Sequence, residues 1–148
     1  AEWGGIAKDG AKLVNAVANS VVPKITLVIG GSYGAGNYAL SGRAYSPRFM
    51  FSWPSSKIAV MGGNSAAKTL SQIKLSKMGK VSEDIKNNLY NEIKTIYDKQ
   101  SDSRYAAARL WVDEIINPED TRSVLVRSLE IISNQQTISS PNFGVLQV

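Results

Sequence analysis

The sequence of 148 residues contains no cysteine and no histidine. Without cysteine, disulfides, thiol nucleophiles and the usual zinc sites are excluded. Without histidine, the commonest general base and the commonest metal ligand are missing as well. Any chemistry must therefore use carboxylates, lysine, tyrosine, serine or backbone groups, and we expect no metal site.

Long apolar runs are also missing. The most apolar short run, residues 25–29, has the length of a strand, far below the roughly 20 residues that cross a membrane. The first residues do not form a charged region followed by an apolar stretch, so no signal peptide is expected. The sequence does not begin with methionine, which fits a fragment or a processed form.

The charge is moderately basic, with a net value of +5 and a pI of about 9.5. Such a surface suits nucleic acid, a phosphorylated cofactor such as CoA, or an acidic partner chain. The densest basic stretch, residues 68–80, carries four lysines. We interpret it as a solvated face or a cofactor rim rather than a nucleic-acid site.

Apolar spacing and breakers predict a single α/β domain with helices mostly on one side. The predicted strands cover residues 24–29, 49–53 and 57–61, and the predicted helices cover residues 5–20, 66–74, 82–97, 103–116 and 118–133. Asn64 or Ser65 is expected to cap the second helix and Ser82 the third. These few short strands do not complete a sheet. We therefore expect much apolar surface to face another chain or domain.

The glycine-rich segment, residues 30–37, carries the strongest chemical signal. It reads GGSYGAGN, follows a predicted buried strand and precedes a short helix expected to start at Tyr38. Glycine allows a ligand to approach the main chain, and clustered N–H groups stabilise an oxyanion or a phosphate. A tight turn needed for packing alone explains the local pattern equally well.

Two other interpretations of this segment are weaker. A dinucleotide or P-loop site needs the G-x-G-x-x-G order or a Lys-Ser/Thr pair, and neither is present. Ser32 as a nucleophile lacks both a histidine partner and the G-x-S-x-G elbow.

Several ordered segments resemble the β subunits of biotin-dependent acyl-CoA carboxylases, in particular those that act on methylcrotonyl-CoA. The matching segments are GIAKDGAK at 5–12, PKIT at 23–26, the glycine-rich segment with Tyr38, GRAYSPRF at 42–49, WP at 53–54, VMGG at 60–63, Ala66 with Ala67, ARLW at 108–111, Ile115 with Ile116, Pro118, DTR at 120–122 and NFG at 142–144. The resemblance covers nearly the whole chain.

The sequence departs from the pattern of that family at three positions. Asn64 stands where glutamate is usual, Glu114 where glycine is usual, and Asn117 where aspartate is usual. These positions lie outside the glycine-rich segment and concern substrate and subunit contacts more than the reaction class. Ala39 replaces the acidic residue of the propionyl-CoA branch, which favours the methylcrotonyl or geranyl branch.

The resemblance implies a crotonase-like (ClpP/crotonase) fold, a spiral of β-β-α units. It implies that residues 1–148 are a single C-terminal carboxyltransferase domain, without the N-terminal domain that holds most of the acyl-CoA site. The active site would form between the N domain of one subunit and the C domain of another. The implied partners are a biotin carboxylase or biotin carrier subunit and further copies of the subunit, with neither nucleic acid nor membrane. The bacterial cytoplasm and the mitochondrial matrix are both possible locations.

The resemblance also implies a reaction and a set of site residues. The reaction is carboxyl transfer from carboxybiotin to the γ-carbon of an unsaturated acyl-CoA, 3-methylcrotonyl-CoA in leucine degradation. The backbone N–H groups of Gly36 and Asn37 would stabilise negative charge on the biotin ureido oxygen, while biotin itself takes the substrate proton. The residues expected to line the biotin pocket are Tyr33, Gly34, Ala35 and Tyr38, although the two tyrosines fit packing beside the turn equally well.

Other interpretations remain beside this one. Geranyl-CoA, propionyl-CoA or acetyl-CoA are alternative substrates, and the isolated domain is expected to be inactive. A non-catalytic crotonase-fold assembly module is a further alternative, whereas a hydratase or isomerase needs a carboxylate that the glycine-rich segment lacks. We expect Arg43 and Arg48 to form structural ion pairs, with orienting the turn or meeting phosphate as the alternative. We expect Phe51, Trp53 and Trp111 to lie in the core or an interface.

Overall fold

The computed structural model of the chain describes residues 2–79 and 81–134. The predicted irregular tail and the NFG match at 142–144 lie outside the described residues. Within them the order of elements is mixed α/β, as the sequence predicts.

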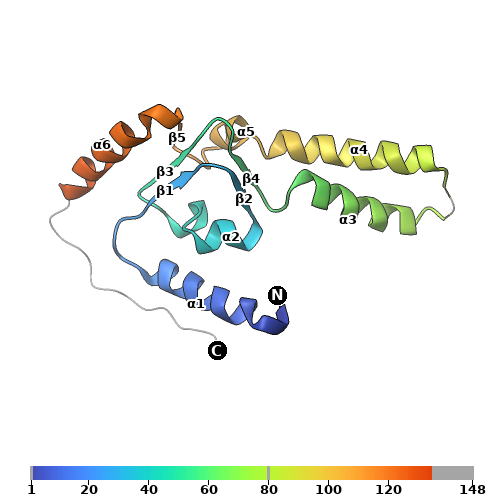
Figure 1. Ribbon diagram of the computed structural model, residues 1–148, viewed down its shortest axis with the longest axis horizontal. Coiled ribbons are helices and arrows are strands. Elements are labelled where there is room, and N and C mark those ends of the chain that lie inside the picture. Colours follow the sequence, from blue (N-terminus) through green and yellow to red (C-terminus); the bar gives the residue numbers. More distant parts are fainter. Residues whose placement is uncertain (1, 80, 135–148) are drawn as a thin grey trace.

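The strands form two small parallel sheets, and consecutive strands alternate between them (Figure 1). One sheet has the order β1 (Ile25–Val28), β3 (Phe49–Ser52) and β5 (Glu114–Ile115), and the other pairs β2 (Gly31–Tyr33) with β4 (Lys57–Ala59). Helix α2 (Gly34–Ala39) follows β1 and β2, and α3 (Gly63–Ser76) follows β3 and β4. The chain therefore repeats a β-β-α order.

The core is small and lies where the two sheets meet the segment after α5 (Ser103–Ala107). Its buried cluster contains Val28, Met50, Ile58, Ala106 and Val112. The three strands predicted from apolar runs are confirmed, because these residues supply the core from β1, β3 and β4. Phe51 is buried as expected. Trp111 is 39% exposed and lies outside the core, so its expected place in an interface stays a prediction.

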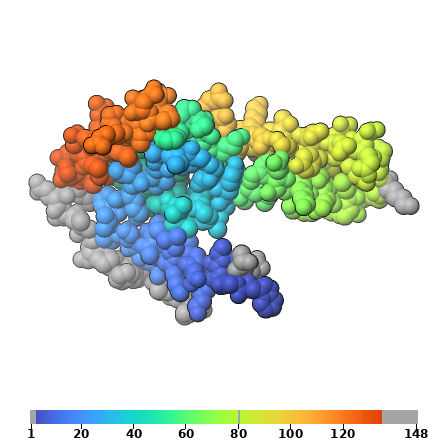
Figure 2. Space-filling model, viewed as in Figure 1, coloured from blue at the N-terminus to red at the C-terminus, as the bar shows by residue number. Residues whose placement is uncertain are grey.

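The helices surround this core unevenly. Helix α1 (Ile6–Asn19) has no buried residue and lies on one side of the body, while η3 (Pro118–Asp120) and α6 (Thr121–Ser133) lie on another (Figure 1). Helices α3 and α4 (Glu83–Gln100) run antiparallel and form a hairpin that projects from the body (Figures 1 and 2). Two short 3-10 turns, η1 (Glu2–Gly4) and η2 (Arg43–Tyr45), complete the described elements.

The predicted helix over residues 103–116 is wrong. Helix α5 ends at Ala107, Leu110 has a left-handed backbone (φ 58°), and residues 114–115 form β5. The main chain instead pairs with β3, since Asp113 N–H donates to Met50 O at 2.7 Å and Ile116 N–H donates to Ser52 O at 2.9 Å. These long-range bonds override the local helical propensity of the alanines.

The glycine-rich segment also differs from its prediction. Residues 31–33 form a strand, and the following helix begins at Gly34 rather than Tyr38. One expected cap differs as well, because Gly62 stands at the N-cap of α3 in place of Asn64 or Ser65. Ser82 lies at the N-cap of α4 as predicted, without a side-chain cap bond.

Much apolar surface is left uncovered on the body. Large apolar side chains that are more than half exposed include Ile6, Val22, Ile29, Leu40, Val60 and Leu110. This agrees with the expectation that these few strands do not bury all of the apolar residues. None of the helices in the described part of the chain has both the length and the apolar character that a membrane crossing needs.

Candidate functional site

The glycine-rich segment joins the two sheets. The chain leaves β1, passes Ile29 and Gly30, forms β2 and turns into α2 at Gly34. Gly34 has a φ of 53°, and a Cβ at this position would lie 3.0 Å from the Val60 carbonyl oxygen. Glycine is therefore required here both by conformation and by the close approach of the β4 end.

Strand β2 is fixed against β4. The register pairs Gly31 with Lys57 and Tyr33 with Ala59, and Lys57 N–H donates to Gly30 O at 3.0 Å. The Tyr33 ring lies against Gly31, where a Cβ would come within 2.6 Å of Tyr33 Cε2. Tyr33 thus packs on its own strand and still keeps 37% of its surface exposed.

The start of α2 decides which backbone donors are free. In a helix capped at Tyr33, the first internal bond runs from the Asn37 N–H to the Tyr33 carbonyl. The N–H groups of Gly34, Ala35 and Gly36 come before that bond and have no acceptor inside the helix. A Cβ at Gly36 would meet no atom within 4 Å, so the space beside this residue is open.

The Asn37 side chain points back toward the sheet. Its Nδ2 donates to Ser32 Oγ at 2.8 Å, and its backbone oxygen accepts from Gly42 N–H at 2.8 Å. The side chain is half-buried, in contrast to its neighbours Gly36 and Tyr38. Asn37 therefore connects α2 to β2 on one side and to the following loop on the other.

Tyr38 lies on the outer side of α2 with 49% of its surface exposed. Its ring meets the Tyr45 ring edge to face, with the centroids 6.2 Å apart. The four residues expected to line a biotin pocket thus lie together between the end of β2 and α2. The structure brings them side by side with Gly36 and Asn37, and both tyrosines also pack locally.

An ion pair holds the loop after α2, and the sequence predicts only one of its two partners. Arg43 Nη2 lies 2.9 Å from Asp113 Oδ1, and Arg43 Nε donates to Trp111 O at 3.0 Å. Asp113 Oδ2 also accepts from the Met50 N–H at 2.7 Å. The expected structural ion pair of Arg43 is confirmed, whereas Asp113 was missed because its partners lie more than sixty residues away.

Arg48 behaves differently from its prediction. In the described part of the chain it makes no ion pair, and its guanidinium lies over the Phe49 ring at 5.4 Å from the centroid. A groove of about 550 Å³ lies beside β1. It is lined by Leu13 and Val17 of α1, by β1, and by the segment from Asn37 to Ser41.

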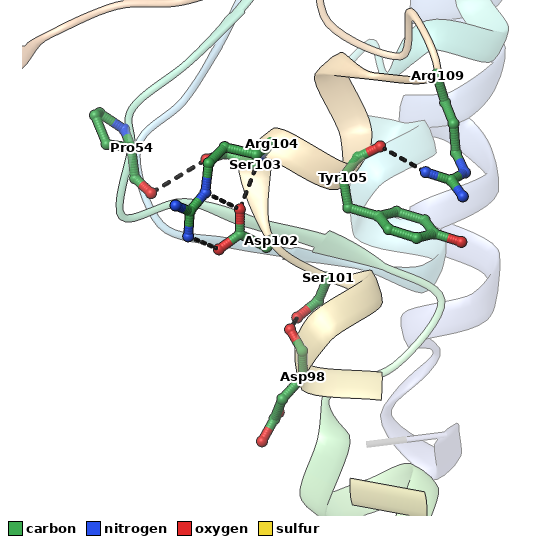
Figure 3. A network of polar contacts seen from close by, with 8 residues as sticks. All are labelled: Pro54, Asp98, Ser101, Asp102, Ser103, Arg104, Tyr105 and Arg109. Carbon is green, nitrogen blue, oxygen red and sulfur yellow. Dashed lines mark hydrogen bonds and ion pairs between the residues drawn. The ribbon is translucent and has the colours of Figure 1, made fainter. Parts of the chain in front are cut away.

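The largest pKa shift among the described residues lies where α4 meets α5. Figure 3 shows the polar contacts of this joint. Hydrogen bonds from Arg104 lower the pKa of Asp102 from 3.8 to about 2. Ser103 Oγ donates to Pro54 O at 3.1 Å, which ties this joint to the β3–β4 turn. We interpret these contacts as structural. Among residues 2–79 and 81–134, no three acidic side chains lie close enough to hold a metal ion.

Comparison with known proteins identifies the family. The profile described as "Carboxyl transferase domain" matches residues 1–146. The chain is 47% identical over 150 residues to the "Methylcrotonoyl-CoA carboxylase beta chain, mitochondrial" of Dictyostelium discoideum, covering 97% of this chain and 25% of that protein. It is 46% identical over 151 residues to the "Biotin-dependent 3-methylcrotonyl-coenzyme A carboxylase beta1 subunit" of Mycobacterium tuberculosis, covering 99% of this chain and 28% of that protein.

Solved structures agree with this result. The β subunit of Pseudomonas aeruginosa geranyl-CoA carboxylase superposes with a TM-score of 0.82 at 41% identity, covering 98% of this chain and 28% of that chain. Transcarboxylase 12S superposes with a TM-score of 0.78 at 34% identity, covering 97% of this chain and 27% of that chain. This chain thus spans about a quarter of the length of its relatives. The chain belongs to the carboxyl transferase domain family.

Proposed function

We propose that this chain is the C-terminal domain of a biotin-dependent acyl-CoA carboxyltransferase, and that a separate N-terminal domain holds most of the acyl-CoA site. The observation that carries the proposal is the 44–47% identity to methylcrotonyl-CoA carboxylase β chains over 97–100% of this chain. In two of these relatives the aligned stretch covers 100% of this chain and therefore includes the glycine-rich segment. By itself the domain would be inactive.

The fold proposed for the domain is a crotonase-like spiral of β-β-α units. The alternation of consecutive strands between two parallel sheets supports it, as does the repeated β-β-α order at β1-β2-α2 and β3-β4-α3. In such a spiral each unit delivers the end of its second strand and the start of its helix to the same edge. That edge is where we place the reaction.

Within the site, the backbone N–H groups of the glycine-rich segment would hold the ureido oxygen of biotin. Gly36 and Asn37 are the proposed donors, and the helix start makes the Ala35 N–H a stronger candidate than that of Asn37 for the second position. Bound biotin would supply the activated carboxyl group and take up the substrate proton. Removing one such donor costs about 10²–10³ in turnover in comparable sites.

The open space beside Gly36 fits this role, because a planar ring can reach the main chain only where no side chain intervenes. Tyr33 and Tyr38 would flank the ring on either side, with Gly34 and Ala35 between them. The absence of histidine is compatible with the scheme, since no side-chain base is needed. A carboxylate base of the hydratase type has no candidate in residues 30–38.

We propose 3-methylcrotonyl-CoA, an intermediate of leucine degradation, as the substrate. Geranyl-CoA is the second candidate, because the geranyl-CoA carboxylase β subunit superposes with a TM-score of 0.82. Biotin would arrive on a biotin carrier or biotin carboxylase subunit. The subunit would assemble with further copies of itself, in line with the solved transcarboxylase 12S, whose description includes hexamer assembly. The proposed locations are the bacterial cytoplasm and the mitochondrial matrix.

The experiment that tests the function is bicarbonate fixation by the full-length subunit with its biotin-carrying partner. Methylcrotonyl-CoA, geranyl-CoA and propionyl-CoA are offered in parallel, with avidin as the blocking control. Avidin-sensitive carboxylation of methylcrotonyl-CoA is the expected result, and a preference for geranyl-CoA selects the second candidate. If a correctly assembled complex carboxylates none of them, the reaction is wrong and a non-catalytic assembly role remains.

A further inference from the structure

We infer that the Asn37 side chain, held between Ser32 and Gly42, is the positioning residue that fixes the backbone donors of the glycine-rich segment. This inference rests on the proposed carboxyl transfer and concerns the same site. It assigns a role to the amide side chain of Asn37, separate from its main-chain N–H. It also assigns roles to Ser32 and Gly42.

Helix α2 needs such a device because its own structure holds it poorly. It has six residues, none of them buried. Helices of this length are not stable alone in water and take their position from tertiary contacts. Since no residue of α2 is buried, its polar contacts contribute much of what decides where its N–H groups point.

The first contact ties α2 to the sheet. Asn37 Nδ2 donates to Ser32 Oγ at 2.8 Å, and Ser32 is the central residue of β2. In the register Ser32 lies beside Ile58, which belongs to the buried core cluster. The amide of Asn37 is thereby connected through one hydroxyl to a strand that pairs with the buried core.

The second contact binds the main chain of Asn37 and places Gly42 directly against the Asn37 side chain. Gly42 N–H donates to Asn37 O at 2.8 Å, and a Cβ at Gly42 would overlap Asn37 Oδ1 and lie 2.7 Å from Asn37 O. Gly42 has a φ of −63° and a ψ of 175°, values that any residue adopts. Glycine is thus required at position 42 by the close approach of Asn37 alone.

A third contact holds the end of α2. Thr26 Oγ1, on β1, donates to Ser41 O at 2.7 Å, while Ser41 is buried in a left-handed conformation with φ 61°. The helix is consequently fixed from β2 at one end and from β1 at the other. Asn37 makes the first of these two contacts, so the loss of its amide loosens the segment that carries Gly36.

The chemical consequence follows from preorganisation. Backbone donors stabilise a developing charge when they are already aimed at it, and a displacement of about 1 Å costs about 10²-fold in rate. Substrate binding depends largely on the other domain in the proposed enzyme. Loosening α2 should therefore lower kcat and leave KM for the acyl-CoA almost unchanged.

The test uses the full-length subunit with its biotin-carrying partner and measures kcat and KM. Asn37→Ala and Ser32→Ala should each lower kcat about tenfold to a hundredfold. Ser32→Thr keeps the hydroxyl acceptor and suits a strand, so it should restore kcat. The double variant Ser32→Ala with Asn37→Ala should be no worse than the poorer single variant, because both remove one contact.

Melting curves and the assembly state establish that each variant is folded. A folded Ser32→Ala variant with wild-type kcat, a loss confined to KM, or additive effects in the double variant would each overturn the positioning role. If the wild-type complex carboxylates none of the three acyl-CoA esters, the proposed function fails and the positioning role fails with it. A fully active wild type with fully active variants overturns only the positioning role.

Discussion

Gly36 has open space where a side chain would stand, and it lies in the first turn of a helix. Replacing it with alanine should stabilise the protein by about 0.5–1 kcal/mol, because alanine restricts the unfolded chain and favours the helix. The same methyl group would stand where the proposed biotin ring approaches the main chain. We therefore expect higher thermal stability of Gly36→Ala together with lower turnover, measured by melting and by carboxylation.

Gly10→Ala is the matched control. Gly10 lies inside helix α1 and also has no atom within 4 Å of a Cβ. This variant should gain similar stability and keep wild-type turnover. Gly36→Pro adds the complementary test, because it deletes the N–H group itself and should lower turnover about 10²–10³-fold. Full activity of folded Gly36→Ala and Gly36→Pro would remove Gly36 from the site.

Leu110 lowers the stability of the folded protein in two ways. Its backbone is left-handed with φ 58°, and its side chain is 81% exposed. Leu110 N–H donates to Ala107 O and Trp111 N–H donates to Ala106 O, the pattern in which glycine is usual at the left-handed position. Leu110→Gly should raise the free energy of unfolding by about 0.5–1 kcal/mol, as relief of strain exceeds the entropy cost of glycine.

The control for Leu110 is alanine, which keeps the unfavourable backbone and removes most of the side chain. Leu110→Ala should therefore show no gain in the same chemical denaturation experiment. If alanine stabilises as much as glycine, the cost lies in the exposed apolar surface rather than in the backbone. If both variants destabilise, the leucine side chain makes a contact that stabilises the assembled protein.

At the level of elements, the N-terminus of α5 depends on Asp102. Its Oδ1 accepts from Arg104 N–H and Arg104 Nε, both at 2.9 Å, and these bonds lower the pKa of Asp102 to about 2. A carboxyl whose pKa falls on folding adds stability above its ordinary pKa near 3.8, and this stability is lost as the pH drops toward 2. The stability advantage over Asp102→Asn should therefore be constant near neutral pH and shrink below pH 3.8.

NMR titration of the Asp102 carboxyl carbon measures the same effect directly. Arg104→Ala should raise its pKa only part of the way, because the backbone bond from residue 104 remains. Arg109→Ala is the matched control, since that guanidinium lies over the Tyr105 ring and donates to Tyr105 O. An ordinary pKa for Asp102 in the wild type would contradict the prediction.

The elements also show which parts of the fold local sequence patterns can predict. Helices α1, α4 and α6 and strands β1, β3 and β4 were predicted because their apolar spacing is local and strong. Strand β2 could not be predicted because it has only three residues, begins with glycine and pairs only with distant β4. Strand β5 was assigned to a helix because its pairing with β3 crosses more than sixty residues.

In the candidate site, too, some features could be predicted from local sequence and others depend on long-range contacts. The glycine-rich segment could be found from its composition, and its relevance came from resemblance to a family rather than from the glycines themselves. The side chain of Asn37 could not be assigned, since its partners Ser32 and Gly42 become neighbours only when β2 and α2 form. Local patterns indicate which residues are exceptional, and the long-range contacts decide what they touch.

At the scale of the whole molecule, the chain divides into a body and a projecting hairpin (Figure 2). The body joins two small sheets and exposes large apolar side chains around the glycine-rich segment, among them Tyr33, Leu40 and Val60. The hairpin packs mainly on itself, and its base is tied to the body where Ile58 N–H donates to Ser101 O at 2.9 Å. The position of α3 against α4 at this base therefore sets the direction of the hairpin.

Gly63 is the residue that permits this arrangement. It is buried where α3 begins, and a Cβ there would overlap the Asp98 carboxylate and lie 3.2 Å from the Lys94 carbonyl oxygen. Asp98 can rotate away only by leaving Lys94, its partner at 2.5 Å, and the carbonyl cannot rotate at all. Gly63→Ala should lower the free energy of unfolding by about 1 kcal/mol or more, measured by chemical denaturation.

The neighbouring glycine supplies the control for this last prediction. Gly62 has an ordinary backbone, with φ −67° and ψ 152°, and a Cβ there would lie 3.8 Å from Tyr33 Cζ, a normal contact. Gly62→Ala should therefore change stability little, because the restriction of the unfolded chain offsets the weaker N-cap of alanine. Hydrogen exchange should then show faster opening of α3 and α4 in Gly63→Ala, with β1 and β3 unchanged, because the hairpin opens as its own unit. Equal destabilisation by the two variants, or faster exchange spread over the body, would mean that the hairpin and the body unfold together.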